Sequence, residues 1–158
     1  MKRTLLILLI LTVSKTYSQD TLKTKEIDLI VKNINQSNLA TELDTIILDK
    51  PELGLKMITY LTMVVSDNQL KKYKNFVNTT MIQNGATKKM TTSTTFYYDK
   101  NKLIKVEEYM IESENKIIMD WYYSEDKSLY YTLQSENSEE RAQFLLTLSE
   151  TMLKQIIK

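Results

Sequence analysis

The chain has 158 residues, and its 21 lysines and arginines nearly balance its 20 aspartates and glutamates. This length suits one domain with a substantial core, while the balanced charge excludes the basic field that nucleic-acid binding requires. Histidine and cysteine are both absent, which excludes Ser-His-Asp and Cys-His nucleophile pairs and zinc sites of the Cys/His type. We therefore expect no cofactor, no metal and no enzymatic activity.

The N-terminus has the pattern of a secretory signal peptide. A start with two basic residues precedes an apolar run over residues 5–13, and small residues then lead to a possible cleavage point before Gln19. The apolar run is far shorter than the roughly 20 residues that span a bilayer. We predict a signal peptide over residues 1–18, a single domain over residues 19–158, and export to the periplasm or out of the cell.

The first expected helix covers residues 22–36, because isoleucine and valine recur there at the three- and four-residue spacing of one helix face. A short strand is expected next, near residues 43–48. Pro51 and Gly54 end this strand, since both residues interrupt regular structure.

The stretch over residues 56–133 is rich in β-branched and aromatic residues, and polar turns divide it into six strands. The strongest turn signal is Asn84-Gly85, because both residues tolerate positive φ. Residues 70–82 fit either a strand or a helix capped by Asp67, and their many β-forming residues favour the strand. Short turns make neighbouring strands antiparallel, so the six strands should form a meander.

The chain closes with an expected helix that begins near Ser138. Acidic residues occupy its first turn and lysines its end, as the helix dipole favours. Together these elements predict an α+β fold, in which an antiparallel meander of about six strands has the N- and C-terminal helices packed on one face.

Alternation along the strands separates an apolar side of the sheet, which we expect the helices to cover, from a mixed side. The mixed side carries one tyrosine on each of four successive strands, with charged residues beside them. Its members are Tyr97, Lys105, Glu107, Tyr109, Asp120, Tyr122 and Tyr130. An aromatic band of this kind suits partner binding, because tyrosine offers a large amphipathic contact area. The alternative is cross-strand pairing that only stabilises the sheet.

Lys105, Glu107 and Asp120 also allow two interpretations. Two carboxylates can perform acid–base chemistry when their environments separate their pKa values. Solvated ion pairs along a sheet are the more common arrangement. We therefore assign no catalytic residue among them.

The stretch "YYDKNKLIKVEEY" resembles the D/N-x-x-K-L-x-K-V hairpins of small exported proteins of unknown function from Bacteroidota. The leader that ends in Ser-Gln is similar too. The resemblance implies an envelope or secreted location, and it carries over no activity, cofactor or site residue. The order of elements is also similar to that of lipoprotein carriers and other cystatin-like domains, which wrap a curved sheet around helices.

These observations predict a non-catalytic exported module that binds an envelope protein or another envelope component through the mixed face. The alternative is a carrier that holds a lipid or another apolar ligand between the helices and a curved sheet. The walls of that site would include Met57, Met119, Trp121 and Met152. The sequence leaves the partner and the oligomeric state open.

Overall fold

The computed structural model describes residues 21–37, 39, 41–112, 114–125, 127–132 and 137–156. The predicted signal peptide over residues 1–18 lies outside the described residues. No helix in this described part of the chain is long and apolar enough to cross a membrane.

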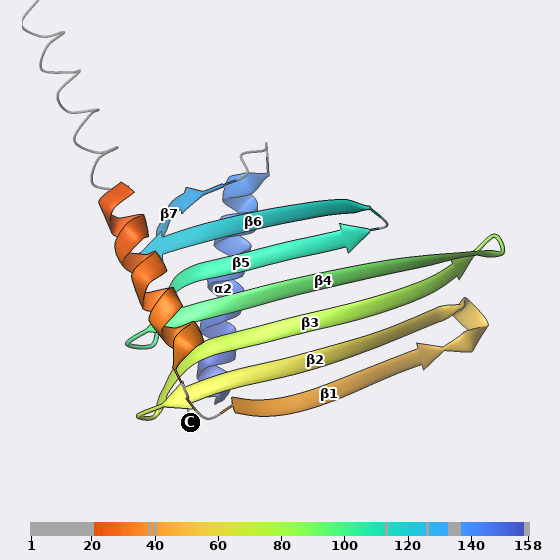
Figure 1. The fold of residues 1–158 in the computed structure, drawn as a ribbon, viewed down its shortest axis with the longest axis horizontal. Coiled ribbons are helices and arrows are strands. Elements are labelled where there is room, and N and C mark those ends of the chain that lie inside the picture. The colour runs from red at the N-terminus through yellow and green to blue at the C-terminus, as the bar shows by residue number, and fades with distance from the viewer. Residues whose placement is uncertain are drawn as a thin grey trace, which may run out of the picture.

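The chain forms one seven-stranded antiparallel sheet with a helix before it and a helix after it (Figure 1). The N-terminal helix occupies residues 21–36. The strands follow in sheet order as β1 (Thr41–Lys50), β2 (Leu55–Ser66), β3 (Gln69–Gln83), β4 (Ala86–Asp99), β5 (Lys102–Glu112), β6 (Asn115–Ser124) and β7 (Lys127–Tyr131). A 3-10 helix, η1 (Pro51–Leu53), joins β1 to β2, and α2 (Ser138–Ile156) follows the sheet.

This arrangement confirms the α+β class and the antiparallel meander. The sheet has seven strands where about six were expected, because the short segment predicted near residues 43–48 is a ten-residue strand that pairs with β2 along its whole length. Residues 70–82, which also fitted a helix, belong to β3. Pairing with β2 on one side and β4 on the other provides backbone partners for this strand.

Two-residue turns set the register of three hairpins. Both residues of each turn have positive φ, which is the geometry that matches the twist of the flanking strands. The three pairs are Asp67-Asn68, Asn84-Gly85 and Lys100-Asn101. The turn predicted at Asn84-Gly85 is therefore confirmed.

The two helices lie on opposite faces of the sheet, and the prediction that both pack on one face is wrong (Figure 1). The N-terminal helix buries Ile27 and Val31 against Tyr97 and Tyr122. We call the face that it covers the N-helix face. The other face, the α2 face, carries a second buried cluster that includes Phe96, Tyr98, Val106, Trp121, Tyr123, Ala142 and Leu145. Successive strand residues point to opposite faces, so the pairs Tyr97-Tyr98 and Tyr122-Tyr123 present large side chains on both sides of the sheet, and a helix covers each side.

The helices cover only one end of the sheet. Figure 1 shows both of them crossing the strands near the ends of β4 and β6, while the sheet continues well beyond them toward the β1–β2 connection. Exposed isoleucines occur on this uncovered part, among them Ile46, Ile47, Ile82 and Ile118. The uncovered part therefore presents apolar side chains to solvent on both faces.

Candidate binding surface of the sheet

Five of the seven predicted site residues meet beneath the N-terminal helix. Lys105 lies at their centre, and its side chain is only 7% exposed. Its Nζ lies 3.0 Å from Asp28 of the helix, 3.1 Å from Glu107 and 3.4 Å from Asp120. The same ammonium group lies 4.9 Å from the centre of the Tyr122 ring. We call Asp28, Lys105, Glu107 and Asp120 the Lys105 cluster.

Tyrosine hydroxyls connect this cluster to the helix. Tyr122 donates a hydrogen bond to Asp28 Oδ1 over 2.9 Å, and Tyr97 donates one to Glu107 Oε2 over 2.9 Å. Asn35 of the helix donates through Nδ2 to the Tyr97 hydroxyl oxygen over 3.3 Å. Both tyrosines therefore join the sheet to the helix by polar contacts as well as by packing.

The expectation that Tyr97 and Tyr122 face outward is wrong. Tyr97 is 2% exposed and Tyr122 is 6% exposed, because the N-terminal helix covers them. Their neighbours Tyr98 and Tyr123 are buried on the α2 face. Both members of the pairs Tyr97-Tyr98 and Tyr122-Tyr123 therefore pack inward, and Tyr97 and Tyr122 support the fold and do not form an open surface.

The electrostatics of the cluster keep Lys105 charged. Burial by itself would lower the pKa of Lys105. Its hydrogen bonds to Asp28 and Tyr122, together with the negative charges of Asp120 and Glu107, outweigh burial and raise this pKa above its ordinary value. The cluster is thus a set of ion pairs that attaches the helix to β5 and β6.

Burial also raises the pKa of three other groups in this region, Asp120, Tyr97 and Tyr122. Burial raises the pKa of Asp120 above its usual range, although Lys105 opposes that rise. Burial raises the pKa of Tyr97 and that of Tyr122 to about 12, so both hydroxyls remain protonated donors at neutral pH. No group of three His, Cys, Asp or Glu side chains that could hold a metal ion occurs among the described residues.

The remaining two predicted residues lie outside the Lys105 cluster. Tyr130 on β7 is exposed and packs against Tyr122 with ring centres 5.9 Å apart. Tyr109 on β5 lies farther along the N-helix face, where its ring centre is 6.4 Å from that of Phe76 on β3. The four tyrosines therefore do not form one continuous band.

Tyr109 belongs to a different row of aromatic residues, which crosses the uncovered part of the N-helix face. The register aligns Tyr60 with Phe76, Phe76 with Ser93, and Ser93 with Tyr109. The ring centres of Tyr60 and Phe76 are 6.0 Å apart. Ser93 is buried between the flanking rings, and its Oγ has no hydrogen-bond partner in the part of the chain that the structure describes.

Exposed isoleucines lie beside this aromatic row. Ile118 of β6 is the register partner of Tyr109, and Ile47 of β1 pairs with Ile58 of β2 one step farther along the face. Ile47 is 62% exposed and Ile118 is 58% exposed. We call the combined surface the sheet patch, and its members are Ile47, Ile58, Tyr60, Phe76, Tyr109 and Ile118. Ile58, Phe76 and Tyr109 are half-buried, and the other three members are exposed. Contiguous apolar surface that is at least partly exposed is typical of interaction sites.

Sequence reasoning found Tyr109 but missed Tyr60 and Phe76. Each of the two residues occurs in a strand with period-two alternation, so the sequence did indicate that it lies on a sheet face. The alignment across strands depends on the register, which the pattern of single strands does not contain.

A groove of about 390 Å³ lies beside α2 on the opposite face. Met110 of β5 and Met119 of β6 line it, and Arg141 of α2 lies along it. Arg141 forms an ion pair with Glu108, whose carboxylate also accepts a hydrogen bond from Trp121 Nε1 over 3.0 Å. This contact attaches α2 to the sheet.

Three of the four expected walls of a carrier site lie in the core or in this groove, and Met57 lies apart from them. Trp121 is buried in the cluster that α2 covers, and Met152 packs against the same cluster. Met119 also contacts that cluster and reaches the groove. Met57 lies on β2, in register with Leu48 of β1. The space between α2 and the sheet is therefore filled at Trp121.

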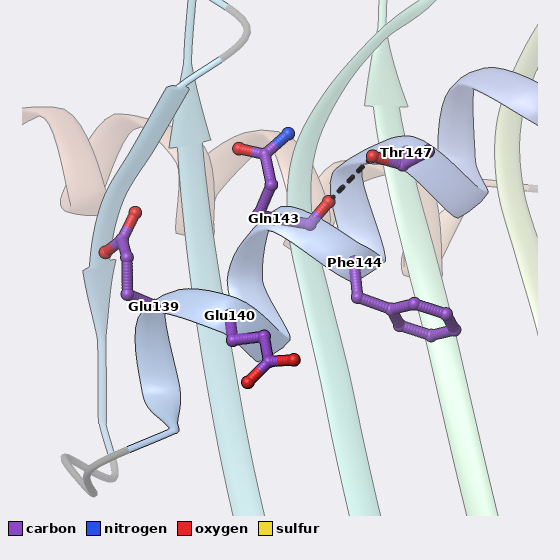
Figure 2. Close-up of a pocket in the computed structure, with 5 residues that line it drawn as sticks. All are labelled: Glu139, Glu140, Gln143, Phe144 and Thr147. Carbon is purple, nitrogen blue, oxygen red and sulfur yellow. Dashed lines mark hydrogen bonds between the residues drawn. The ribbon is translucent and has the colours of Figure 1, made fainter.

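A shallow depression of about 560 Å³ lies on the outer side of α2, and Figure 2 shows its residues. Glu139, Glu140, Gln143 and Phe144 spread in different directions from the helix. Thr147 Oγ1 donates to the backbone oxygen of Gln143 over 3.0 Å. The side chains do not converge on a common point, so this depression does not have the geometry of an active site.

Comparisons with family models, with curated proteins and with solved structures found no significant match. We therefore infer function from the geometry of the chain alone.

Proposed function

We propose that this protein is a non-catalytic, exported binding module that recognises an envelope component through the sheet patch. The observation that carries this proposal is the aromatic row Tyr60–Phe76–Tyr109, whose members do not belong to either of the clusters that the helices cover. Aromatic side chains give large contact areas at a small cost in conformational entropy, and they are common at the centres of interfaces.

The surroundings of the row resemble the rim of an interface. Lys74 Nζ lies 5.5 Å from the centre of the Phe76 ring, and Lys116 and Thr91 lie in the next row on the same face. An apolar centre with polar neighbours allows water to be excluded from the centre while the rim stays hydrated. The proposed partner is therefore a protein or another large component with an apolar surface of its own.

Most of the residues that the sequence suggested for binding do not belong to the sheet patch. Tyr109 stays in the proposed surface, and exposed Tyr130 lies on the other side of the buried Tyr122. Lys105 and its carboxylate partners attach the helix, which favours the structural interpretation for them.

Photo-cross-linking in the native host tests the proposal. A photoreactive amino acid in place of Tyr60 should give a discrete adduct, because that side chain lies in the sheet patch and is exposed. The matched control carries the same amino acid in place of Thr147, which is exposed on the outer side of α2. Equal adducts at both positions, or none at position 60, would contradict the proposal.

The second candidate is a carrier of an apolar molecule, and the groove beside Met110 and Met119 is the observation that favours it. In that case native mass spectrometry of the protein purified from its own envelope would show a constant added mass that is lost on denaturation. The filled space around Trp121 makes this the weaker of the two candidates.

A further inference from the structure

In the part of the chain that the structure describes, no strand pairs with the outer edge of β1. All ten of its residues pair with β2 in unbroken register, so the strand has neither a bulge nor an internal proline. Aliphatic side chains project from both of its faces, Leu43 and Ile47 on the N-helix face and Ile46 and Leu48 on the α2 face. Natural edge strands usually carry bulges, prolines or charges that prevent further pairing. β1 has neither bulge nor proline, but it carries charged residues, among them Asp44, Asp49 and Lys50, so a strand can pair with this edge where its own charges complement them.

The free backbone groups of this edge can be assigned. The Thr45 N–H donates to Asp44 Oδ1 over 2.7 Å, so this N–H lies on the outer side of β1. Orientation alternates along an antiparallel strand, and the N–H and C=O groups of Ile47 and Asp49 therefore point outward as well. Among the described residues, the Asp44 carboxylate occupies part of this edge.

The sequence of β1 is complementary to itself in one antiparallel register. When a two-fold axis perpendicular to the sheet relates two copies of β1, the N-helix faces of both copies lie on the same side of the joined sheet. Residues with even numbers therefore lie opposite residues with even numbers. With Ile47 opposite Ile47 of a second copy, Ile46 lies opposite Leu48, and Asp44 lies opposite Lys50. A shift by two residues places Asp44 opposite Leu48 in one direction and opposite Glu52 of η1 in the other, so Asp44 then lies opposite no lysine.

We propose that β1 pairs with β1 of a second copy of this chain in that register, which joins two seven-stranded sheets into one continuous sheet. On pairing, the Asp44 carboxylate leaves the Thr45 N–H and binds Lys50 of the second copy, while the Thr45 N–H donates to the backbone of Asp49 in that copy. Charge and apolar complementarity select a second copy as the occupant of the edge. This inference is independent of the proposed function.

Charge exchange at the two complementary positions tests the register. Analytical ultracentrifugation of the exported protein should give twice the mass of one chain at high concentration. Asp44→Lys and Lys50→Asp should each raise the dissociation constant about tenfold, because each variant opposes like charges twice across the axis. The double variant should restore the unmodified value, and an equimolar mixture of the two single variants should form a mixed dimer.

An apolar position supplies the matched control. Ile47→Lys should abolish the dimer, since two lysines would meet at the two-fold axis. Ile118→Lys changes an equally exposed isoleucine at the other end of the sheet patch, and it should leave the dimer intact. The proposal is overturned if the unmodified protein sediments as a single chain at every accessible concentration. Retention of the dimer in Ile47→Lys, or no rescue in the double variant, also overturns it.

Discussion

Lys105 shows how a single residue attaches the N-terminal helix to the sheet. Its three carboxylate partners come from three elements, Asp28 from the helix, Glu107 from β5 and Asp120 from β6. A buried ammonium group without partners would be strongly unfavourable, and carboxylates without their cation would repel each other. The contact therefore stabilises the docked helix only while all of its members are present.

Replacement of the lysine tests this account. Lys105→Met should lower the free energy of unfolding by about 2 kcal/mol, which is less than the loss for a fully buried pair because the carboxylates are partly exposed. Urea denaturation at neutral pH measures the change. Lys116→Met on β6 removes an exposed lysine and should change the stability by less than about 0.5 kcal/mol. Equal effects of the two substitutions would show that the cluster does not hold the helix.

At the scale of elements, the connection between β1 and β2 depends on the residue at position 54. Gly54 has a φ of 59°, and its carbonyl accepts a hydrogen bond from the Ile82 N–H over 2.8 Å. A Cβ added at Gly54 would lie 2.9 Å from the Ile82 backbone oxygen. Gly85 has a φ of 73°, but a Cβ added there would meet no atom within 4 Å. Both glycines therefore have positive φ, but only Gly54 lies close to the backbone of another strand.

This difference predicts unequal costs for the same substitution. Gly85→Ala should destabilise the protein by about 1 kcal/mol, which is the cost of a side chain at positive φ. Gly54→Ala should cost about 2–3 kcal/mol, because backbone atoms must also move apart. Thermal or urea denaturation of both variants measures the difference. Similar losses would indicate that the β1–β2 connection shifts away from β3 without a penalty.

At the scale of the whole molecule, buried tyrosines on both faces link the stability of the fold to alkaline pH. Burial raises the pKa values of Tyr97 and Tyr122 on one face, and that of Tyr98 on the other, from 10 to about 12. An unfolded tyrosine loses its proton near its ordinary pKa, so the folded state binds more protons between these two values. The contribution of these tyrosines to the free energy of unfolding is complete below the ordinary pKa and is lost as the pH rises through the pKa of the folded state.

The free energy of unfolding should therefore fall between about pH 10 and about pH 12. Urea denaturation across this interval, with tyrosinate absorbance recorded in parallel, measures the fall. Tyr97→Phe removes one of the titrating hydroxyls and should make the fall shallower, whatever its effect on stability at neutral pH. A fall of unchanged steepness in this variant would show that Tyr97 does not contribute to the linkage.

Several features of this protein follow from local patterns in its sequence. Period-two alternation and polar turns located β2 to β7, and the spacing of isoleucine and valine located the N-terminal helix. Lys105, Glu107 and Asp120 could be grouped as well, because alternation places them on one side of neighbouring strands. These signals extend over a few residues, and they remain readable without knowledge of the rest of the chain.

Other features were decided only by the tertiary structure. Tyr97 and Tyr98 are both large and point to opposite faces, so their sequence pattern does not indicate which face a helix covers. The packing shows that one helix covers each face. The row of Tyr60, Phe76 and Tyr109 depends on the register across β2 to β5, which turns and the bulge between Tyr97 and Tyr98 determine together. Alternation specifies the face of the sheet on which a side chain lies. It does not specify the side chain's neighbours on other strands or the helix that covers it, because contacts between residues far apart in the chain set both.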